Sequence, residues 1–239
     1  MPVKMEIAPA NVNSFKSIFN SINTIVDTLT FECYDDRVEI NALDKSRTVF
    51  ISCMMTSDYF QSYACEDPDR FNIDVTEFRK IIKSCNKDLT LEFTNEEIII
   101  KSTTKTFSIY QVNDDENTPK PPNMDYAVRF NVPINYLKSM VKDIELFAKD
   151  VTIKTSSNQA SFTTSGTSGK FNDTYTVDDE LKSAKVKIST EKFSTCIASD
   201  KVSDDVELQF DTDMPLVLLQ EAEGIRLMYL IAPRIDVSD

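Results

Sequence analysis

The side chains that usually perform chemistry are scarce in this chain of 239 residues. It has no histidine, so the usual general base near neutral pH and every histidine-dependent triad or metal site are absent. Its three glycines, Gly166, Gly169 and Gly224, cannot build a glycine-rich phosphate-binding loop. The chemistry left open is magnesium-dependent phosphodiester cleavage by paired carboxylates.

Four acidic clusters could hold such a metal ion. They fall between segments of alternating hydrophobicity or in a polar stretch, positions that are typical of solvated turns. We therefore favour turns, and we expect neither a metal ion nor another cofactor, with a magnesium-dependent nuclease as the alternative. The clusters are Asp35–Asp36, Asp114–Glu116, Asp178–Glu180 and Asp204–Asp205.

The cysteines and the apolar runs indicate the compartment. Five cysteines, odd in number and without C-x-x-C spacing, predict buried reduced thiols rather than disulfides or a zinc site. No apolar run reaches the length of a membrane span, and the first residues lack the apolar stretch of a signal peptide. We expect an intracellular protein without a membrane partner. The cysteines are Cys33, Cys53, Cys65, Cys85 and Cys196.

An internal repeat supplies the elements that position these side chains. The segment from Phe15 matches the segment from Leu137 without a gap, and both have the i, i+3, i+4, i+7 apolar spacing of an amphipathic helix, followed by an alternating strand. The halves match again from Phe78 and Phe193, where a second helix follows a capping residue, Asp74 or Thr76 in one half and Ser189 or Thr190 in the other. The pattern predicts two similar α+β domains. The helices are predicted at about residues 11–26, 75–87, 134–147 and 189–201.

A polar stretch rich in proline separates the two halves. Because proline fixes φ and favours an extended path, we interpret this stretch as a linker that crosses between domains. The predicted boundaries are 1–111 for the N-terminal domain, 112–125 for the connector and 126–239 for the C-terminal domain.

The net charge of −13 argues at first against nucleic acid, because neutralising phosphates requires Lys and Arg. The positive charge is segregated, however: the predicted helices carry nine basic and five acidic residues, a net +4, whereas the rest of the chain carries −17. This distribution predicts sequence-independent, salt-sensitive attraction to duplex DNA along the helices. The alternative is that lysine stems merely cover apolar surface. The candidate DNA-binding residues are Lys16, Arg79, Lys80, Lys83, Lys87, Lys138, Lys142, Lys192 and Lys201.

Several stretches, in this order and spacing, resemble the sliding clamps of archaea and eukaryotes known as proliferating cell nuclear antigen. They are Ala42–Arg47, Phe71–Lys83, Pro119–Pro122, Met214–Val217 and Gly224–Ile235. The resemblance covers essentially the whole chain, and its proline pattern leans towards the archaeal branch. It implies a DNA clamp fold in which three subunits close a ring, with helices lining the hole and sheets outside. It also implies a processivity factor that tethers DNA polymerase to DNA and catalyses nothing itself.

The same resemblance implies surfaces for partners and for neighbouring subunits. A clamp loader, DNA polymerase, flap nuclease and DNA ligase would bind, the enzymes through short peptides whose apolar and aromatic residues enter a pocket beside the linker. The pocket would comprise Leu43, Phe50, Met124, Pro215, Leu230, Ala232 and Pro233. Subunits would join edge to edge through Phe107, Ile109 and Tyr110 on one side and Phe171, Thr174 and Tyr175 on the other.

The subunit composition of the ring and the location of the protein in the cell each leave two alternatives. The ring is expected to be a homotrimer or a heterotrimer, and a specialised or checkpoint-type subunit would work only in a mixed ring. The protein would lie in the cytoplasmic nucleoid of an archaeon or in the nucleus of a eukaryote. Thr118 and the single basic residue of the first helix, Lys16, depart from the family pattern.

Overall fold

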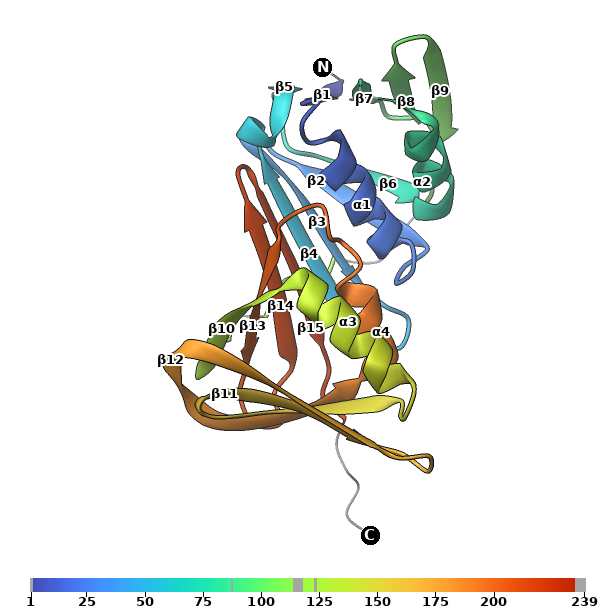
Figure 1. Cartoon of the computed structure of the whole chain (residues 1–239). Helices are drawn as coiled ribbons and strands as arrows, with labels where there is room; N and C mark the ends of the chain where they lie inside the picture. The colour runs from blue at the N-terminus through green and yellow to red at the C-terminus, as the bar shows by residue number, and fades with distance from the viewer. Residues whose placement is uncertain (1, 87, 114–117, 123, 235–239) are drawn as a thin grey trace.

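The computed structural model describes residues 2–86, 88–113, 118–122 and 124–234. Four helices lie on one side of a long sheet, two beside each half of the chain (Figure 1). They are α1 (Val12–Ile22), α2 (Val75–Ser84), α3 (Ile134–Glu145) and α4 (Thr190–Cys196). A short 3-10 helix, η1, spans Ser57–Tyr59.

The described strands form three sheets. One has the order β5-β1-β7-β8-β9, a second has the order β10-β13-β14-β15-β4-β3-β2-β6, and β11 pairs with β12. The strands of the N-terminal half are β1 (Val3–Ile7), β2 (Thr28–Cys33), β3 (Arg37–Leu43), β4 (Val49–Thr56), β5 (Phe60–Ala64), β6 (Asp69–Asp74), β7 (Leu89–Phe93), β8 (Glu97–Ser102) and β9 (Lys105–Tyr110). Those of the C-terminal half are β10 (Val128–Pro133), β11 (Asp150–Ser165), β12 (Lys170–Ser189), β13 (Asp205–Phe210), β14 (Leu216–Ala222) and β15 (Ile225–Ile231).

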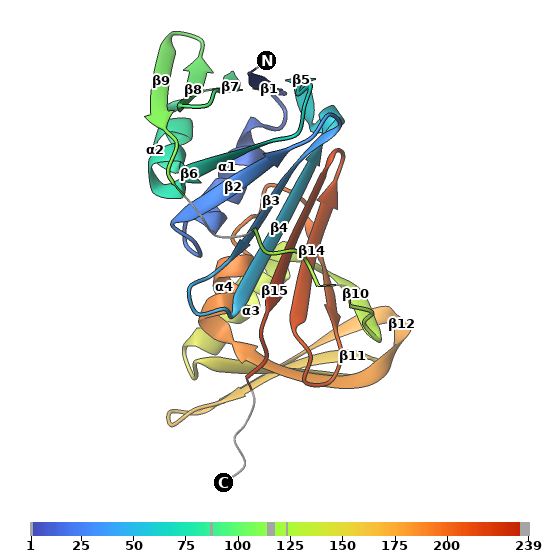
Figure 2. The ribbon, with the colours of Figure 1, turned by 180° about the vertical axis from the view of Figure 1, so that it is seen from behind.

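The eight-stranded sheet joins the two halves. Its central junction is the antiparallel pair β15–β4, which runs from Ile225 opposite Met55 to Ile231 opposite Val49. Helices cover one face of this sheet, and the described part of the linker crosses the other face (Figure 2). The repeat predicted two similar units, but a sheet shared between them was not predicted.

The repeat extends to the strand pairing. In the N-terminal half, β2 pairs with β6 and β3 pairs with β4. In the C-terminal half, 150–155 of β11 pairs with 184–189 of β12, and 159–165 pairs with 170–176. β11 turns back near Ser157, where φ is +54°, and Ser161 Oγ donates to the carbonyl of Lys154 at 3.1 Å across this turn. The segment 170–176 is therefore the counterpart of β4, and β9 is the counterpart of β15.

The helix stripes predicted from apolar spacing are confirmed as core. Each fully buried side chain of this kind contributes roughly 1.5–3 kcal/mol. The four positions in α1 and their counterparts in α3 are at most 2% exposed: Phe15, Ile18, Phe19, Ile22, Leu137, Met140, Val141 and Ile144.

The structure selects one capping residue at each second helix. Asp74 Oδ1 accepts the N–H of Glu77 at 2.9 Å, and Ser189 Oγ accepts the N–H of Lys192 at 3.5 Å. Each cap satisfies one of the backbone donors that a helix leaves unpaired at its N-terminus.

The helices are shorter than predicted. α1 stops at Ile22 and α4 at Cys196, yet Ile25 and Ile197 still pack on the core, so the apolar spacing continues into non-helical turns. Lys201 consequently lies in a turn after α4, and Lys87 lies outside the described residues. Within their observed bounds the helices carry seven basic and four acidic residues, a net +3.

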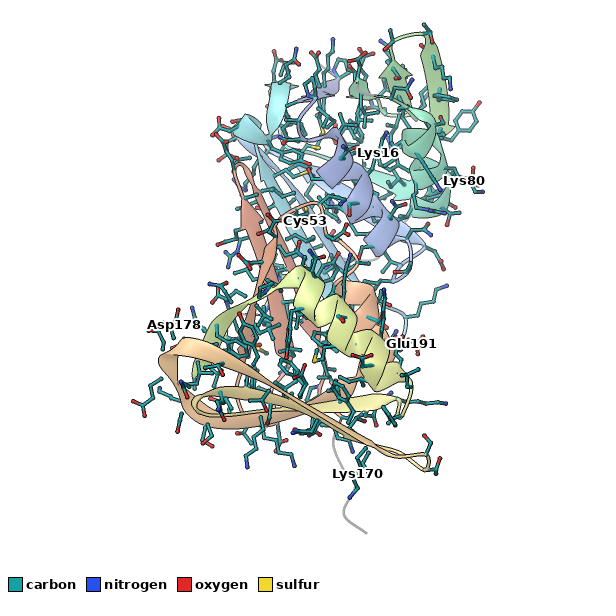
Figure 3. The ribbon with its side chains drawn as sticks, viewed as in Figure 1. Lys16, Cys53, Lys80, Lys170, Asp178 and Glu191 are labelled. Carbon is teal, nitrogen blue, oxygen red and sulfur yellow. The ribbon has the colours of Figure 1, made fainter. Side chains whose placement is uncertain are left out.

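Other predictions have mixed outcomes. All five cysteines are free and buried, as predicted, and burial raises the pKa of Cys53 to about 12. Asp178–Glu180 were expected in a turn, but they lie as exposed residues within β12, which continues through this acidic stretch (Figure 3). The cluster Asp114–Glu116 falls outside the described residues. None of the described helices is long and apolar enough to cross a membrane.

Candidate DNA, partner and subunit surfaces

The candidate DNA-binding residues divide into two groups. Lys80, Lys83, Lys142 and Lys201 are exposed. Lys80 Nζ lies 2.7 Å from Glu77 Oε1, but both side chains are more than half exposed, and such surface pairs contribute about 0–1 kcal/mol. The other three make no ion pair with any residue that the structure describes. These four cations are available to phosphates.

The second group already has protein partners. Lys16 Nζ donates to the carbonyls of Cys85 at 2.5 Å and Asn86 at 3.3 Å, where it complements the C-terminus of α2. Arg79 Nη1 donates to Asn20 Oδ1 at 3.2 Å. These contacts tie α1 to α2, so both cations also position the helices. Lys16 on α1 and Lys80 on α2 are labelled in Figure 3.

Two further lysines of this group form partly buried ion pairs. Lys138 Nζ lies 2.6 Å from Asp200 Oδ2, with both side chains about 30% exposed. Lys192 Nζ lies 3.2 Å from Asp44 Oδ2, and the Asp44 side chain is only 4% exposed. A phosphate would have to compete with these carboxylates.

One exposed cation on the helix layer was missed. Lys149 follows α3, and its carbonyl accepts the N–H of Thr190 at 2.8 Å, which places it beside the start of α4. It lies two residues past the predicted end of the third helix and was therefore not counted. Its position in the short segment that connects α3 to β11, next to the predicted helix, was the sequence feature that could have indicated Lys149.

Residues of the predicted partner pocket lie on the face of the eight-stranded sheet that the linker crosses. Leu43 pairs with Phe50, which pairs with Leu230, which pairs with Val217, so all four side chains share one face. Phe50 and Leu230 are buried, whereas Leu43 is 38% exposed. Val217 was missed, although it belongs to the stretch that carried the resemblance.

The remaining pocket candidates are Met124 in the linker and three residues that adjoin β14 and β15 in the sequence. Met124, in the linker, packs against the buried cluster that contains Phe50 and Leu230. Its Sδ accepts a hydrogen bond from Tyr126 Oη at 2.8 Å. Pro215, Ala232 and Pro233 are half-buried at the ends of β14 and β15. Of the seven predicted residues, the structure thus places Leu43, Phe50, Leu230 and Met124 at this face, and the other three lie next to the strand ends.

Two recesses flank the linker. One of about 450 Å³ lies against Pro121, Pro122, Met124 and the sheet residue Leu230. The other, of about 650 Å³, is lined by Leu43, the loop residues that follow it, and Pro119. An extended peptide could contact the linker and the apolar row together at this place.

A buried carboxylate organises the β3–β4 loop at the edge of the second recess. Asp44 Oδ1 accepts the N–H groups of Thr48 at 2.6 Å and Val49 at 2.8 Å, and Oδ2 accepts hydrogen bonds from Ser46 Oγ, Thr48 Oγ1 and Lys192. Burial opposes ionisation of Asp44, but these hydrogen bonds outweigh burial and lower its pKa from 3.8 to about 2.

The free energy of unfolding is expected to depend on pH through the ionisation of Asp44. Because the folded pKa of Asp44 is depressed, its contribution is present above pH 4 and is lost as the pH falls towards 2. The stability gap between wild type and Asp44→Asn should shrink below pH 4, by at most about 2.5 kcal/mol. Urea unfolding from pH 6 to pH 3 measures the gap, with the exposed Asp27→Asn as control. A gap that stays constant with pH would contradict this role.

The predicted subunit edges lie at opposite ends of the molecule (Figure 1). Phe107 and Ile109 of β9 pack partly on the core, and Tyr110 is 82% exposed. β9 pairs only with β8 among the described strands. Leu146, just after α3, is 72% exposed and was not among the predicted surface residues.

The other edge is the first part of β12. Phe171 and Tyr175 pack partly on the core, Thr174 is exposed, and the Tyr175 ring centroid lies 5.0 Å from that of Tyr136. Tyr136 Oη also donates to Asp173 Oδ2 at 2.8 Å. On its other side, segment 170–176 has no strand neighbour among the described residues.

The acidic residues form no metal centre that the structure describes. Among the described residues, no group of three or more Cys, Asp and Glu is placed to hold a metal ion. The side chains form three candidate surfaces: exposed cations on the helix layer, an apolar row under the linker, and two strand edges without a strand neighbour among the described residues.

Comparison with known proteins agrees with this arrangement. The family description "Proliferating cell nuclear antigen, N-terminal domain" matches residues 5–129. The chain is 27% identical to the DNA polymerase sliding clamp of Methanothermobacter thermautotrophicus over 236 residues, covering 95% of this chain and 96% of that protein. It is 25% identical to the DNA polymerase sliding clamp of Methanobrevibacter smithii, with 99% of each chain covered.

Solved structures confirm the α+β clamp fold. The proliferating cellular nuclear antigen of Entamoeba histolytica superposes with a TM-score of 0.91 at 20% identity, covering 98% of this chain and 100% of that one. The protein of the same name from Thermococcus kodakaraensis superposes with a TM-score of 0.87, also at 20% identity, covering 97% and 100%.

Proposed function

Because this chain belongs to the proliferating cell nuclear antigen family, we propose that three copies of it close into a ring around duplex DNA, with α1–α4 facing the hole. The chain is a DNA sliding clamp and processivity factor, and its family consists of scaffolds rather than enzymes.

The pairing of β15 with β4 within one chain is the observation that supports the proposed contact between copies in the ring. Within one chain, this antiparallel junction joins the C-terminal half to the N-terminal half. The counterparts of these two strands, β9 and segment 170–176, have open edges at opposite ends of the same chain. Pairing β9 of one copy with 170–176 of the next would repeat the internal junction. It would also give hydrogen-bond partners to the unpaired backbone groups of both edge strands.

The repeat also predicts the register of this contact. The pairing within each half makes Phe107 the counterpart of Tyr229 and Phe171 the counterpart of Ile51. Tyr229 lies opposite Ile51 in the internal junction, so Phe107 of one copy is expected opposite Phe171 of the next. Both side chains face the core, as the partial burial of each supports.

Cysteine cross-linking tests this register. By the same pairing, Ser108 of one copy faces Lys170 of the next, and both are exposed. A chain with Ser108→Cys and Lys170→Cys is expected to form disulfide-linked dimers and trimers on mild oxidation. The native cysteines are buried and should not interfere.

A matched control moves one cysteine along the same strand face. Thr174→Cys combined with Ser108→Cys places the thiols four residues out of register, roughly 13 Å apart along the strand. This pair should remain monomeric on a non-reducing gel. Equal cross-linking of both pairs, or none in either, would contradict the proposed junction.

The exposed helix cations are proposed to meet DNA phosphates. Contacts from flexible lysines to the backbone attract any sequence and allow the ring to slide, because no base edge is read. The available group is Lys80, Lys83, Lys142 and Lys201, with Lys149 added. Lys16, Arg79, Lys138 and Lys192 are proposed to act first as structural cations, and Lys87 remains a candidate outside the described residues.

Partner enzymes are proposed to dock on the opposite face. DNA polymerase, flap nuclease and DNA ligase would place the apolar and aromatic side chains of a short peptide on the row Leu43, Phe50, Leu230 and Val217, beside the linker. A clamp loader would open the ring. One chain carries both edges, so three copies can close a homotrimer, and a mixed ring with related subunits is the alternative. The ring would work where chromosomal DNA lies, in the nucleoid or the nucleus.

A further inference from the structure

One lysine of the helix layer reaches the loop beside the partner recess. Lys192 belongs to α4, on the face proposed to line the hole, whereas Asp44 begins the β3–β4 loop in the other half of the chain. Figures 1 and 2 both draw this loop beside α4. The 3.2 Å contact between Lys192 Nζ and Asp44 Oδ2 therefore links the two functional faces.

We propose that Lys192 is a positioning residue of the partner pocket, whose ammonium holds the Asp44 loop in its binding shape, and that it is not a phosphate contact. The inference rests on the proposed function in one respect, namely that partner peptides bind beside this loop.

The charge balance at Asp44 supports this role. The carboxylate is 4% exposed, and the donors around it are hydroxyl groups, backbone amides and one ammonium. The ammonium of Lys192 is the one cation in hydrogen-bonding contact with Asp44 among the described residues. The two other basic residues of the loop do not form an ion pair with Asp44: Lys45 pairs with Asp27, and Arg47 is exposed. Without Lys192, a buried negative charge would lack its compensating cation.

The loop in turn shapes the pocket. Leu43 directly precedes Asp44 and lies opposite Phe50 in the apolar row. The carbonyl of Thr48 accepts the N–H of Ala232 at 2.8 Å, which fastens the loop to a predicted pocket residue. A loop that relaxes to solvate Asp44 would displace both Leu43 and Ala232, so the effect of losing Lys192 should appear in peptide affinity.

The test compares two lysines of similar exposure that both form ion pairs. Lys192 is 32% exposed and Lys138 is 28% exposed, but the partner of Lys138, Asp200, lies in the turn after α4. The probe is a fluorescein-labelled synthetic peptide with apolar and aromatic side chains. Lys192→Met is expected to raise its Kd about tenfold, and Lys138→Met should leave it unchanged.

Equilibrium binding to a short linear duplex separates positioning from phosphate contact. Lys192→Met should keep the wild-type salt dependence of this affinity, whereas Lys83→Met, at an exposed cation, should lower it by about one phosphate contact per subunit. If Lys192→Met lowered the salt dependence and left the Kd of the peptide unchanged, the lysine would be a DNA contact and the proposal would be wrong.

Rescue distinguishes this role from a general loss of packing. Adding Asp44→Asn to Lys192→Met removes the uncompensated charge and should restore most of the peptide affinity, so the two effects are not additive. Additive losses would overturn the proposal.

Amide exchange provides a readout that needs no peptide. Lys192→Met should speed hydrogen exchange at Thr48 and Val49, whose N–H groups Asp44 accepts, and Lys138→Met should not. A wild-type ring that held DNA but bound no peptide would refute the proposed pocket alone. Unchanged exchange in Lys192→Met would refute the positioning role.

Discussion

Replacing Lys80, Lys83 and Lys142 by glutamate is expected to abolish clamp-stimulated DNA synthesis at physiological salt while the ring stays assembled. These side chains are exposed on α2 and α3, and none makes a partly buried ion pair with a described residue. Each lost phosphate contact reduces the slope of log affinity against log salt by about 0.9, so losing three contacts in each of three subunits reduces it by up to about 8. The introduced carboxylates add repulsion.

Primer extension on a singly primed circle, with loader and polymerase present, measures this loss across a range of salt. The control reverses three lysines on the solvent side of the β11–β12 hairpin, so that the net charge changes equally: Lys154, Lys182 and Lys185. The control should retain most of the stimulation. Equal stimulation by both variants across the salt range would contradict a hole lined by these helices.

Leu43→Asp is expected to weaken partner peptides by about 2 kcal/mol, roughly thirtyfold in Kd, without changing ring mass or DNA retention. Leu43 is 38% exposed beside the buried Phe50 and Leu230, so a carboxylate there meets the peptide rather than the core. Fluorescence anisotropy with a labelled peptide measures the change.

Two companion variants separate pocket chemistry from folding. Leu43→Met keeps an apolar side chain of similar volume and should bind nearly as wild type. Leu230→Ala should also weaken the peptide, and thermal unfolding of that variant shows how much of the loss comes from its buried position. Wild-type affinity in Leu43→Asp would mean that partners dock elsewhere.

Local patterns in the sequence predicted the parts of the fold that depend on local rules. The 3.6-residue spacing from Phe15 and from Leu137 gave the helices, and Asp74 and Ser189 marked two of their starts. The ends were less predictable, because side chains such as Ile197 continue to pack on the core after the helical hydrogen bonds have stopped. Lys201 was assigned to a helix for this reason.

Contacts between distant segments could not be predicted in this way. The junction of β15 with β4 pairs residues 170 to 182 positions apart, and nothing in either strand specifies the other. The same holds for Lys192, which the sequence grouped with the phosphate contacts before the structure placed Asp44 beside it. Leu43, Phe50 and Leu230 were brought together only by the family resemblance, which carries information about long-range pairing that composition and spacing lack.

The mass of the assembly in solution tests the central claim most directly. Light scattering coupled to size exclusion, at micromolar concentration and moderate salt, should give three times the chain mass of 27.2 kDa for the protein alone. Tyr110→Ala, at the exposed end of β9, should shift the mass towards one chain. A wild-type mass of one chain at every concentration, with or without related clamp chains, would contradict the ring.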